Sequence, residues 1–336
     1  MNYLTKKLFA GTAVAALALA GSLGAAVAQD KPTIATVVKI SGIPWFDRMN
    51  TGVVAFQEAN PDVVATQSGP ATADSAQQLQ IVNDLVAKGV SALAVVPMDP
   101  AVLEGTFERA MERGIVVVTH EADNQMNTMA DVEAFDNADY GAALNARLAE
   151  CMGQEGKWTT FVGSLGSRTH MQWVGAGEEN AKQYPGMVLV DPNNESFDDA
   201  NATYEKAKEV LRKHPDIKGF QTSAGNDVLG VGRAIEEAGL SGKVCLVGTG
   251  LPNPSADLLE SGAITAIGFW DPQKAGMAMN SVAKLFLEKK EITDGMDLGV
   301  EGYEKVTVKP GPGKGLLIVG NGMVLADKAT YKDFLF

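Results

Sequence analysis

The sequence predicts an α/β protein of two similar lobes, each built around a parallel β-sheet. Short β-branched or apolar runs alternate with amphipathic segments over most of the chain, as expected when strands alternate with crossover helices. The alternation is interrupted by a polar, irregular stretch at 123–136 and then begins again. The chain has 336 residues, which is long for one compact core and suits two domains of ordinary size.

The first strand and the turn after it predict a ligand site. A β-branched run that begins at Thr33 ends at Lys39, and a Gly/Pro turn then precedes Trp45, Phe46 and a helical pattern. Ligands of open parallel sheets bind beyond the carboxyl ends of the strands. We therefore expect Lys39, Trp45 and Phe46 in a ligand cleft, where two flat aromatic faces suit a sugar ring. The alternative is that both rings simply pack under the first helix.

The other expected elements follow in chain order. Strands are expected at Val63–Thr66, Ala92–Val96, Ile115–Thr119, Thr159–Gly163, Val188–Asp191, Gly219–Thr222, Val244–Gly248 and Ile264–Phe269. Helices are expected at Ala76–Ala87, Val102–Glu112, Met171–Gln183, Ala200–Lys213, Val228–Ala238, Pro254–Ser261 and Pro272–Glu288. The Gly/Pro/Lys-rich tail from Asp294, with short apolar runs at Leu316–Val319 and Met323–Leu325, is expected to be a surface extension that docks on one lobe.

Residues 1–28 have the pattern of a secretory signal peptide. Lys6 and Lys7 form a positively charged n-region, and an Ala/Leu/Gly-rich apolar run covers 8–23. Ala26–Ala28 is a small-x-small cleavage site. The run is shorter than the ~20 strongly apolar residues of a membrane-spanning helix. We expect cleavage on export and a mature protein that is free and soluble outside the cytoplasm.

Charge and cysteine content exclude several classes of partner. The net charge of −13 disfavours nucleic acid and anionic lipid. Cys151 and Cys245 are the only cysteines, and they are either disulfide-bonded or an unbonded helix-end residue and buried strand residue. The sequence has no Cys/His spacing typical of zinc and no Gly-rich phosphate loop, so we expect neither a metal nor a cofactor.

Taken together, these segments resemble the type I periplasmic solute-binding proteins of ABC transporters, in the branch of ribose-, galactose-, rhamnose- and autoinducer-2-binding proteins. The resemblance covers essentially the whole mature chain and rests on the order and spacing of its motifs. They are VVKISGIPWF, IVNDLVAKGVSALAVVPMDP, RAMERGIVVVTHEAD, the Asn226-Asp227 pair, VGTG, GFWDPQKAG and GYEKVTV…GNGMVLADK. The resemblance implies two Rossmann-like lobes joined by a hinge that the chain crosses three times. It assigns residues 30–135 and 271–299 to the amino-terminal lobe and residues 136–270 and 300–336 to the carboxy-terminal lobe.

The resemblance also implies site residues in the first lobe. Glu121 stands where ribose binders carry an Asp, and its carboxylate is expected to accept hydrogen bonds from vicinal hydroxyls. Lys39 matches a lysine of autoinducer-2 binders and needs a partner in the cleft, either Glu121 or Asp271. Asp271 lies at a crossing between lobes and is expected to be a ligand contact, a helix cap, or both. Glu121 as a solvated loop acid and Lys39 reaching solvent are the alternatives. Ala122 replaces the Arg of ribose binders, which weakens any assignment to ribose.

In the second lobe, the resemblance points to four residues. Thr169 and His170 occupy the place of an Asp-Gln pair in autoinducer-2 binders, and a neutral His offers one donor and one acceptor. Asn226 matches an Asn that bonds a sugar hydroxyl, with helix capping as the alternative. Phe197 matches an aromatic residue of ribose binders and is expected to stack on the sugar or, alternatively, to pack under a loop.

The expected function is that of a binding protein rather than an enzyme. A neutral monosaccharide or polyol is captured between the lobes and delivered to an ABC permease, with autoinducer-2 as the alternative ligand. A glycoside-processing enzyme that uses Glu121 and Asp271 as its acid pair is a further alternative. We expect a monomer, with a chemoreceptor as a second candidate partner.

Overall fold

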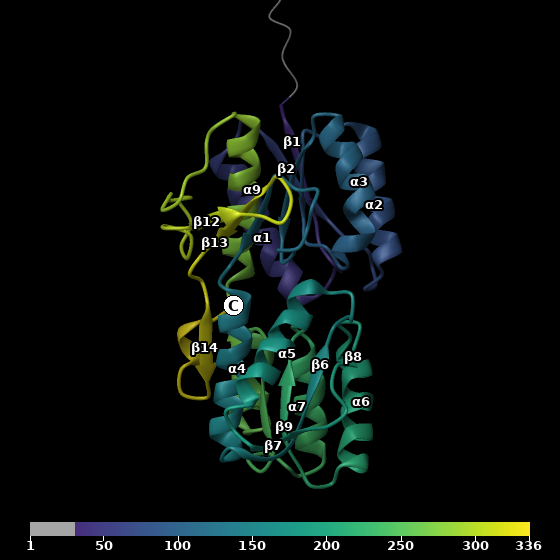
Figure 1. The fold of residues 1–336 in the computed structure, drawn as a ribbon, viewed down its shortest axis with the longest axis vertical. Coiled ribbons are helices and arrows are strands. Elements are labelled where there is room, and N and C mark those ends of the chain that lie inside the picture. Colours follow the sequence, from purple (N-terminus) through teal and green to yellow (C-terminus); the bar gives the residue numbers. More distant parts are fainter. Residues whose placement is uncertain (1–30) are drawn as a thin grey trace, which may run out of the picture. The chain divides into compact units, whose positions relative to one another are not determined.

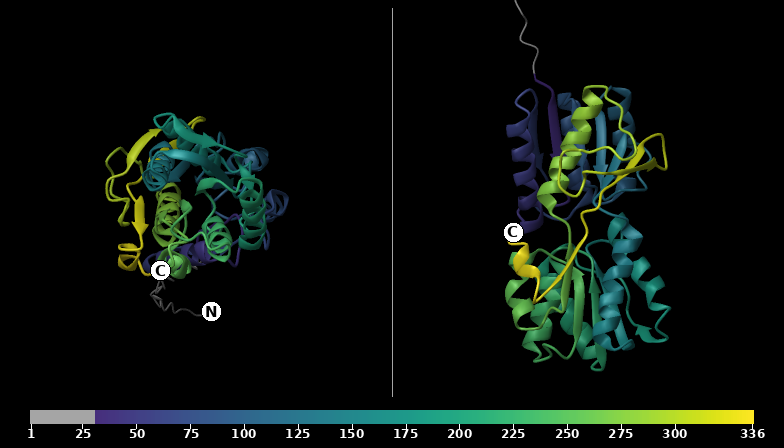
Figure 2. Two further views of the ribbon diagram at one scale, coloured as in Figure 1. Left: turned by 90° about the horizontal axis from the view of Figure 1, so that it is seen from below. Right: turned by 90° about the vertical axis from the view of Figure 1, so that its left-hand side faces the viewer.

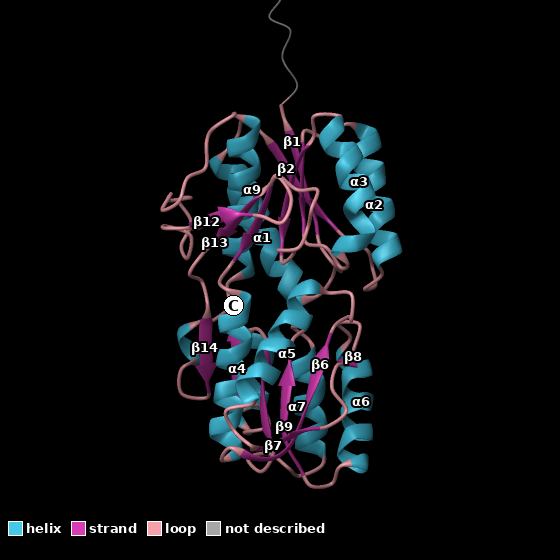
Figure 3. Ribbon diagram, viewed as in Figure 1, coloured by secondary structure: helices cyan, strands magenta, loops and turns pink. Residues whose placement is uncertain are grey.

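The computed structural model describes residues 31–336, so the expected signal peptide at 1–28 lies outside the described residues. Within residues 31–336 the strands form two sheets, and helices cover both faces of each (Figures 1 and 3). Both sheets are mostly parallel, which confirms the predicted fold class. No helix in this part of the chain is long and apolar enough to cross a membrane.

The first lobe is built on a sheet with the strand order β12-β13-β5-β4-β3-β1-β2, in which only β12 runs antiparallel to its neighbour. Helices α1 and α9 pack together on one face, and α2 and α3 cover the other. The strands are β1 (Thr33–Val37), β2 (Val64–Ser68), β3 (Ala92–Val95), β4 (Val116–His120), β5 (Ala130–Glu133), β12 (Thr307–Pro310) and β13 (Leu316–Val319). The helices are α1 (Pro44–Ala59), α2 (Ser75–Lys88), α3 (Pro100–Glu112) and α9 (Pro272–Leu287).

Local sequence explains these elements. Ile34 on one face of β1 belongs to the core shared with α1 and α9, whereas Val37 on the other face packs with α2 and α3. Both faces of the strand are therefore apolar, as in other parallel sheets. Asp74 caps α2 by accepting hydrogen bonds from two backbone N–H groups, and Asp99 caps α3. These caps fix the residues at which α2 and α3 begin, just beyond the ends of the preceding strands.

The second lobe has the strand order β14-β11-β10-β9-β6-β7, with β8 also paired to β6 and β14 antiparallel to β11. Helices α4 and α5 pack against each other, as do α6 and α7. The strands are β6 (Glu155–Val162), β7 (Gly186–Leu189), β8 (Asn194–Glu195), β9 (Ile217–Thr222), β10 (Cys245–Thr249), β11 (Ala266–Phe269) and β14 (Val324–Asp327). The helices are α4 (Asn137–Met152), α5 (Arg168–Ala181), α6 (Ala200–Lys213), α7 (Asp227–Glu237), α8 (Pro252–Glu260) and the 3-10 turn η1 (Tyr331–Asp333).

The carboxy-terminal tail differs from the expectation. Instead of docking on one lobe, it adds β12 and β13 to the first sheet and β14 to the second (Figure 2, yellow). The chain passes between the sheets at 134–136, 270–271 and 320–323. The third crossing therefore lies after β13 and not at the expected boundary between 299 and 300, because β13 pairs with β5 of the first sheet.

Other elements also differ: helix α4 and strand β8 were not expected from the sequence. Helix α1 already begins at Pro44, so Trp45 and Phe46 lie in its first turn and not in a turn before it. Strand β5 lies inside the stretch at 123–136 that the sequence indicates to be irregular. Its residues Asp131 and Glu133 are buried acids, which hide the apolar pattern of a strand.

The carboxyls of Asp131 and Glu133 are both buried in the core, just before the first crossing. The N–H of Ala122 also donates to Asp131 Oδ1 over 3.2 Å. Burial raises the pKa of Asp131 to about 7. Burial and the charge of Asp131 raise the pKa of Glu133 as well. The pair therefore holds protons in the folded protein that free carboxyls would have released.

This pair is expected to make the protein less stable as the pH rises from about 5 to about 8. The folded state binds more protons than the unfolded state between these pH values. The stabilisation is therefore present at low pH and is lost as the pH rises past the pKa that the carboxyls have in the folded protein. Melting temperatures of the Asp131→Asn variant should therefore fall less between these pH values than those of the wild type. Equal changes in melting temperature with pH for the two proteins would contradict the raised pKa of Asp131.

Cys151 near the end of α4 and Cys245 at the start of β10 form a disulfide across 94 residues of sequence. The unbonded alternative is therefore wrong. Replacing both residues by alanine should lower the free energy of unfolding by about 2–4 kcal/mol, because the unfolded chain gains conformational freedom. Urea unfolding measures the loss, and reduced wild type should match the variant. An unchanged midpoint in both would show that the bond contributes nothing.

Candidate functional site

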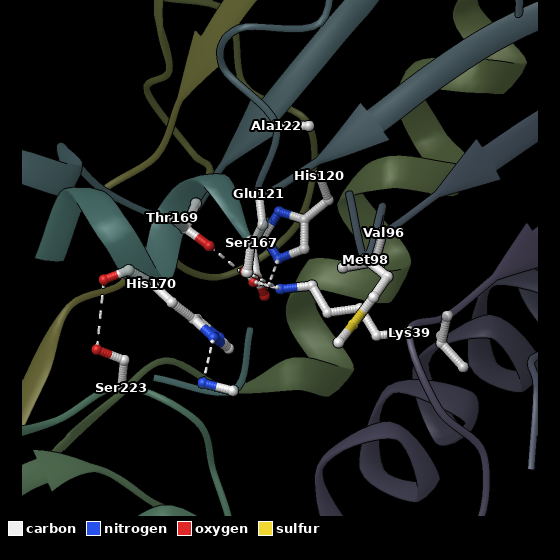
Figure 4. Close-up of polar contacts among 12 residues, drawn as sticks. Lys39, Val96, Met98, His120, Glu121, Ala122, Ser167, Thr169, His170 and Ser223 are labelled. Atoms are coloured by element: carbon white, nitrogen blue, oxygen red, sulfur yellow. Dashed lines mark hydrogen bonds and ion pairs between the residues drawn. The ribbon is translucent and has the colours of Figure 1, made fainter. Parts of the chain in front are cut away.

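A buried ion pair at the ends of two strands forms the centre of the site. Lys39 follows β1 and Glu121 follows β4, and both strands flank β3, so the two side chains emerge at the same edge of the sheet. Lys39 Nζ lies 2.6 Å from Glu121 Oε2, with the side chains 2% and 4% exposed (Figure 4). The two residues expected at strand ends therefore form an ion pair with each other. Of the two expected partners of Lys39, it is Glu121 and not Asp271 that contacts it.

Glu121 is held in its charged form. Burial, the largest single influence, raises the pKa of the carboxyl, but the charges of Lys39, His120 and His170 and the hydrogen bond from Lys39 together outweigh burial and lower the pKa to about 2. Thr169 Oγ1 donates to Oε2 over 3.2 Å, and His120 Nε2 lies 3.7 Å from Oε1. The backbone of Glu121 is in the left-handed region, with φ of 59°. Few non-glycine residues adopt this conformation without a local reason.

The second lobe contributes the start of α5. Ser167 Oγ accepts a hydrogen bond from Lys39 Nζ over 3.4 Å. His170 Nδ1 accepts the N–H of Gly163 over 3.2 Å, which assigns the ring hydrogen to Nε2. Burial and the charge of Lys39 lower the pKa of His170 to about 3, so the ring is neutral. The Nε2–H of His170 therefore has no acceptor among residues 31–336 and can donate to a ligand.

Three tryptophans surround this polar centre. Trp45 and Trp270 meet edge to face with ring centroids 4.6 Å apart, and Trp173 lies 5.7 Å from Trp270. Trp45 starts α1, Trp270 follows β11, and Trp173 lies one helical turn after His170 on α5. The aromatic rings thus come from both lobes and from a crossing segment. Such faces suit the apolar C–H surface of a sugar.

These groups enclose a small cavity. It offers ≈ 20 Å³ to the centre of a water molecule, which is room for about one water. The residues that line it are Lys39, Ile43, Trp45, Phe46, Glu121, His170, Trp173, Asp198, Ser223, Gly225, Thr249 and Trp270. The structure therefore brings five of the sequence-predicted residues together at one cavity, and Thr169 contacts it through Glu121.

Three other predicted residues lie elsewhere. Phe197 is 53% exposed and does not line the cavity. Asn226 Nδ2 donates to the carbonyl of Asp198, so its amide supports the chain behind the cavity. Asp271 caps α9 through the N–H of Gln273 and forms a two-pronged ion pair with Arg48, with distances of 2.9 and 2.7 Å.

Asp271 instead lines a separate cavity of ≈ 440 Å³, together with Arg48 and Tyr303. The acid pair proposed for a glycoside-processing enzyme, Glu121 and Asp271, is therefore not gathered in one cavity. The helix-cap alternative for Asp271 is confirmed, and Arg48 and the helix start engage both of its oxygens. A ligand contact at Asp271 stays a prediction. Among residues 31–336, no group of His, Cys, Asp and Glu is arranged to hold a metal ion.

The sequence reasoning missed Trp173, Trp270 and Asp198. Trp270 directly follows β11, so the strand-end rule that identified Lys39 could have found it. Trp173 is three residues after His170 and shares its helix face. Asp198 is adjacent to Phe197. Which of the two side chains lines the cavity depends on the loop conformation, and a loop conformation leaves no periodic signal in the sequence.

Comparison with known proteins gives one family and several relatives. Residues 34–291 match the sequence profile of the family described as "Periplasmic binding protein domain". The D-allose-binding periplasmic protein of Escherichia coli is 27% identical over 279 residues, which cover 80% of this chain and 87% of that protein. The D-ribose/D-allose-binding protein of Pseudomonas aeruginosa is 27% identical over 250 residues, which cover 70% and 76% of the two chains.

Solved structures show the same fold at lower identity. An ABC transporter solute binding protein from Clostridium phytofermentas with bound L-rhamnose superposes with a TM-score of 0.84 at 19% identity, covering 90% of this chain and 98% of the other. LsrB from Clostridium saccharobutylicum in complex with AI-2 superposes with a TM-score of 0.83 at 19% identity, covering 90% and 100%. The arrangement of the two sheets is thus shared with proteins of this kind.

Proposed function

Because this chain belongs to the periplasmic binding protein family, we propose that it is the substrate-binding component of an ABC transporter and that its cargo is a neutral monosaccharide or sugar alcohol. The observation that carries the proposal is the Lys39–Glu121 pair facing an aromatic-lined cavity. An ammonium and a carboxylate offer donors and acceptors to neighbouring hydroxyls, and the tryptophans cover the C–H face of a sugar. The names of the D-allose and D-ribose relatives support this class of cargo.

Capture requires the lobes to move. Room for about one water is too little for a sugar, so a ligand enters only when the lobes separate. Polar contacts between the lobes favour closure: Lys39 with Ser167, Glu121 with Thr169, and Asp123 with Arg168 at 2.7 Å. A ligand shifts this equilibrium by binding the closed state more tightly than the open one. The crossings at 134–136, 270–271 and 320–323 serve as the hinge.

The proposal includes the cellular setting. The protein is exported by its signal peptide, works as a monomer in the periplasm and hands its cargo to a membrane permease. A chemoreceptor is a second partner for the closed form. The protein makes and breaks no bond in its cargo, so it should leave chromogenic glycosides unchanged.

A thermal-shift screen of the mature protein tests the proposal. The panel contains D-allose, D-ribose, L-rhamnose, D-arabinose, a set of polyols and autoinducer-2. At least one sugar or polyol should raise the melting temperature in a concentration-dependent manner, since ligand that binds only the folded state stabilises it. A shift with autoinducer-2 alone would favour the alternative ligand, and no shift with any compound would contradict the proposal.

A further inference from the structure

A second carboxyl lines the cavity, on the lobe opposite Glu121. Asp198 lies between β8 and α6 and is 5% exposed. It borders the cavity with His170 and Ser223. Among residues 31–336, no group donates a hydrogen bond to its side-chain oxygens. The pKa of the carboxyl is set by burial and by the charges of Lys39 and Glu121. A buried carboxylate without a donor is costly, so a donor from outside the chain is the natural partner.

A neighbouring buried acid shows what a structural role looks like. Asp227 accepts hydrogen bonds from the N–H of Ala224 over 3.0 Å and from Thr203 Oγ1 over 3.2 Å. It does not line the cavity. Asp227 is thus satisfied within the protein, whereas Asp198 is not.

The backbone is shaped to hold Asp198 in place. Phe197 and Asp198 have φ values of 57° and 55°, so two successive non-glycine residues are in the left-handed region. The N–H of Phe197 donates to the carbonyl of Gly163 over 2.8 Å, and Asn226 Nδ2 donates to the carbonyl of Asp198 over 2.8 Å. Glu121 has the same left-handed backbone. Both cavity carboxylates therefore lie on strained residues, which persist where the surroundings fix them, often at ligand sites.

We propose that Asp198 is a specificity-determining ligand contact, which accepts a hydrogen bond from one hydroxyl of the cargo while Glu121 accepts one from another hydroxyl across the cavity. This inference rests on the proposed function and defines its ligand class more closely. Since the two carboxylates come from different lobes, a ligand that satisfies both must bridge the lobes. A carboxylic acid derived from the same sugar would place a third negative group in the cavity and is excluded.

The charge state of Asp198 gives the inference a distinct signature. Burial raises the pKa of Asp198 to about 6, with Lys39 lowering it and Glu121 raising it. His170 and Asp227 are the other titratable groups that face it. A ligand hydroxyl favours the ionised carboxylate, so affinity should rise with pH through about 6 and then level off. Protonation of Asp198 below that pH removes an acceptor that the ligand uses.

Calorimetric titration of the Asp198→Asn variant tests this. The probe is whichever of D-allose, D-ribose, L-rhamnose or D-arabinose most stabilises the wild type. Asn keeps the size of the side chain and tolerates the left-handed backbone, so the ligand-free melting temperature should be unchanged or higher. Binding near pH 7.5 should weaken about 10- to 100-fold, as expected for losing a hydrogen bond to a charged group. The variant should also lose the pH dependence seen in the wild type.

Asp257→Asn on the exposed surface of α8 is the matched control and should bind as the wild type does. Wild-type affinity together with unchanged pH dependence in Asp198→Asn would overturn the inference while leaving the proposed function intact. Tight binding of the sugar's carboxylic acid derivative by the wild type would also overturn it. A wild type that binds no sugar or polyol of the screening panel would overturn the proposed function and, with it, this inference.

Discussion

Replacing Glu121 by alanine should abolish sugar binding and lower the free energy of unfolding by about 3–5 kcal/mol. The substitution leaves the Lys39 ammonium 2% exposed, with Ser167 Oγ at 3.4 Å as its remaining partner. Removing one member of a buried ion pair costs far more than the pair contributes, because the other charge is left without compensation. The carboxylate that the sugar hydroxyls need is lost as well. Urea unfolding and calorimetric titration measure the two effects.

A double variant separates binding from stability. Lys39→Met combined with Glu121→Leu replaces the pair by apolar side chains of similar size, which is often neutral or stabilising. This variant should regain most of the lost stability and still fail to bind sugar. Glu112→Ala, on the exposed last turn of α3, should change neither property. Sugar binding by the double variant at wild-type affinity would contradict the role given to the pair.

Trp45→Ala is the second large effect. The change should cost about 3–5 kcal/mol of stability, because the ring is buried against Trp270 and above Gly225. The sugar-induced rise in melting temperature should disappear, since the ligand loses the aromatic face beside it. Trp45→Phe keeps an aromatic face and should restore much of the shift. Thermal unfolding with and without sugar measures both.

A buried tryptophan far from the cavity supplies the control. Trp158 in β6 is as deeply buried as Trp45 but does not line the cavity. Trp158→Ala should therefore lower stability and keep the sugar-induced shift. A full shift retained by Trp45→Ala would place the ligand somewhere else.

The part of the site at strand ends could be predicted from the sequence. Parallel strands bring their carboxyl ends to one edge, so Lys39 after β1 and Glu121 after β4 had to approach each other once the sheet order placed both next to β3. The same reasoning would have identified Trp270 after β11, which the sequence analysis missed. These positions follow from where the strands end and from their order in the sheet, and the strand ends leave a clear pattern in the sequence.

Other parts depend on contacts that leave no periodic signal. Asp198 lines the cavity and Phe197 does not. Both residues have a left-handed backbone, which few non-glycine residues adopt and which no sequence period indicates. Strand β5 carries two buried acids and so lacks an apolar pattern. The third crossing was misplaced because β13 pairs with β5, and β12 with β13, so that distant parts of the chain join one sheet.

The most direct test of the account is a crystal structure of the mature protein with the sugar that stabilises it most. The account predicts the sugar ring beside Trp45 and Trp270, with separate hydroxyls hydrogen-bonded to Glu121 and to Asp198. A sugar bound in the larger cavity beside Asp271 and Arg48, or one bound without contact to the Lys39–Glu121 pair, would contradict it.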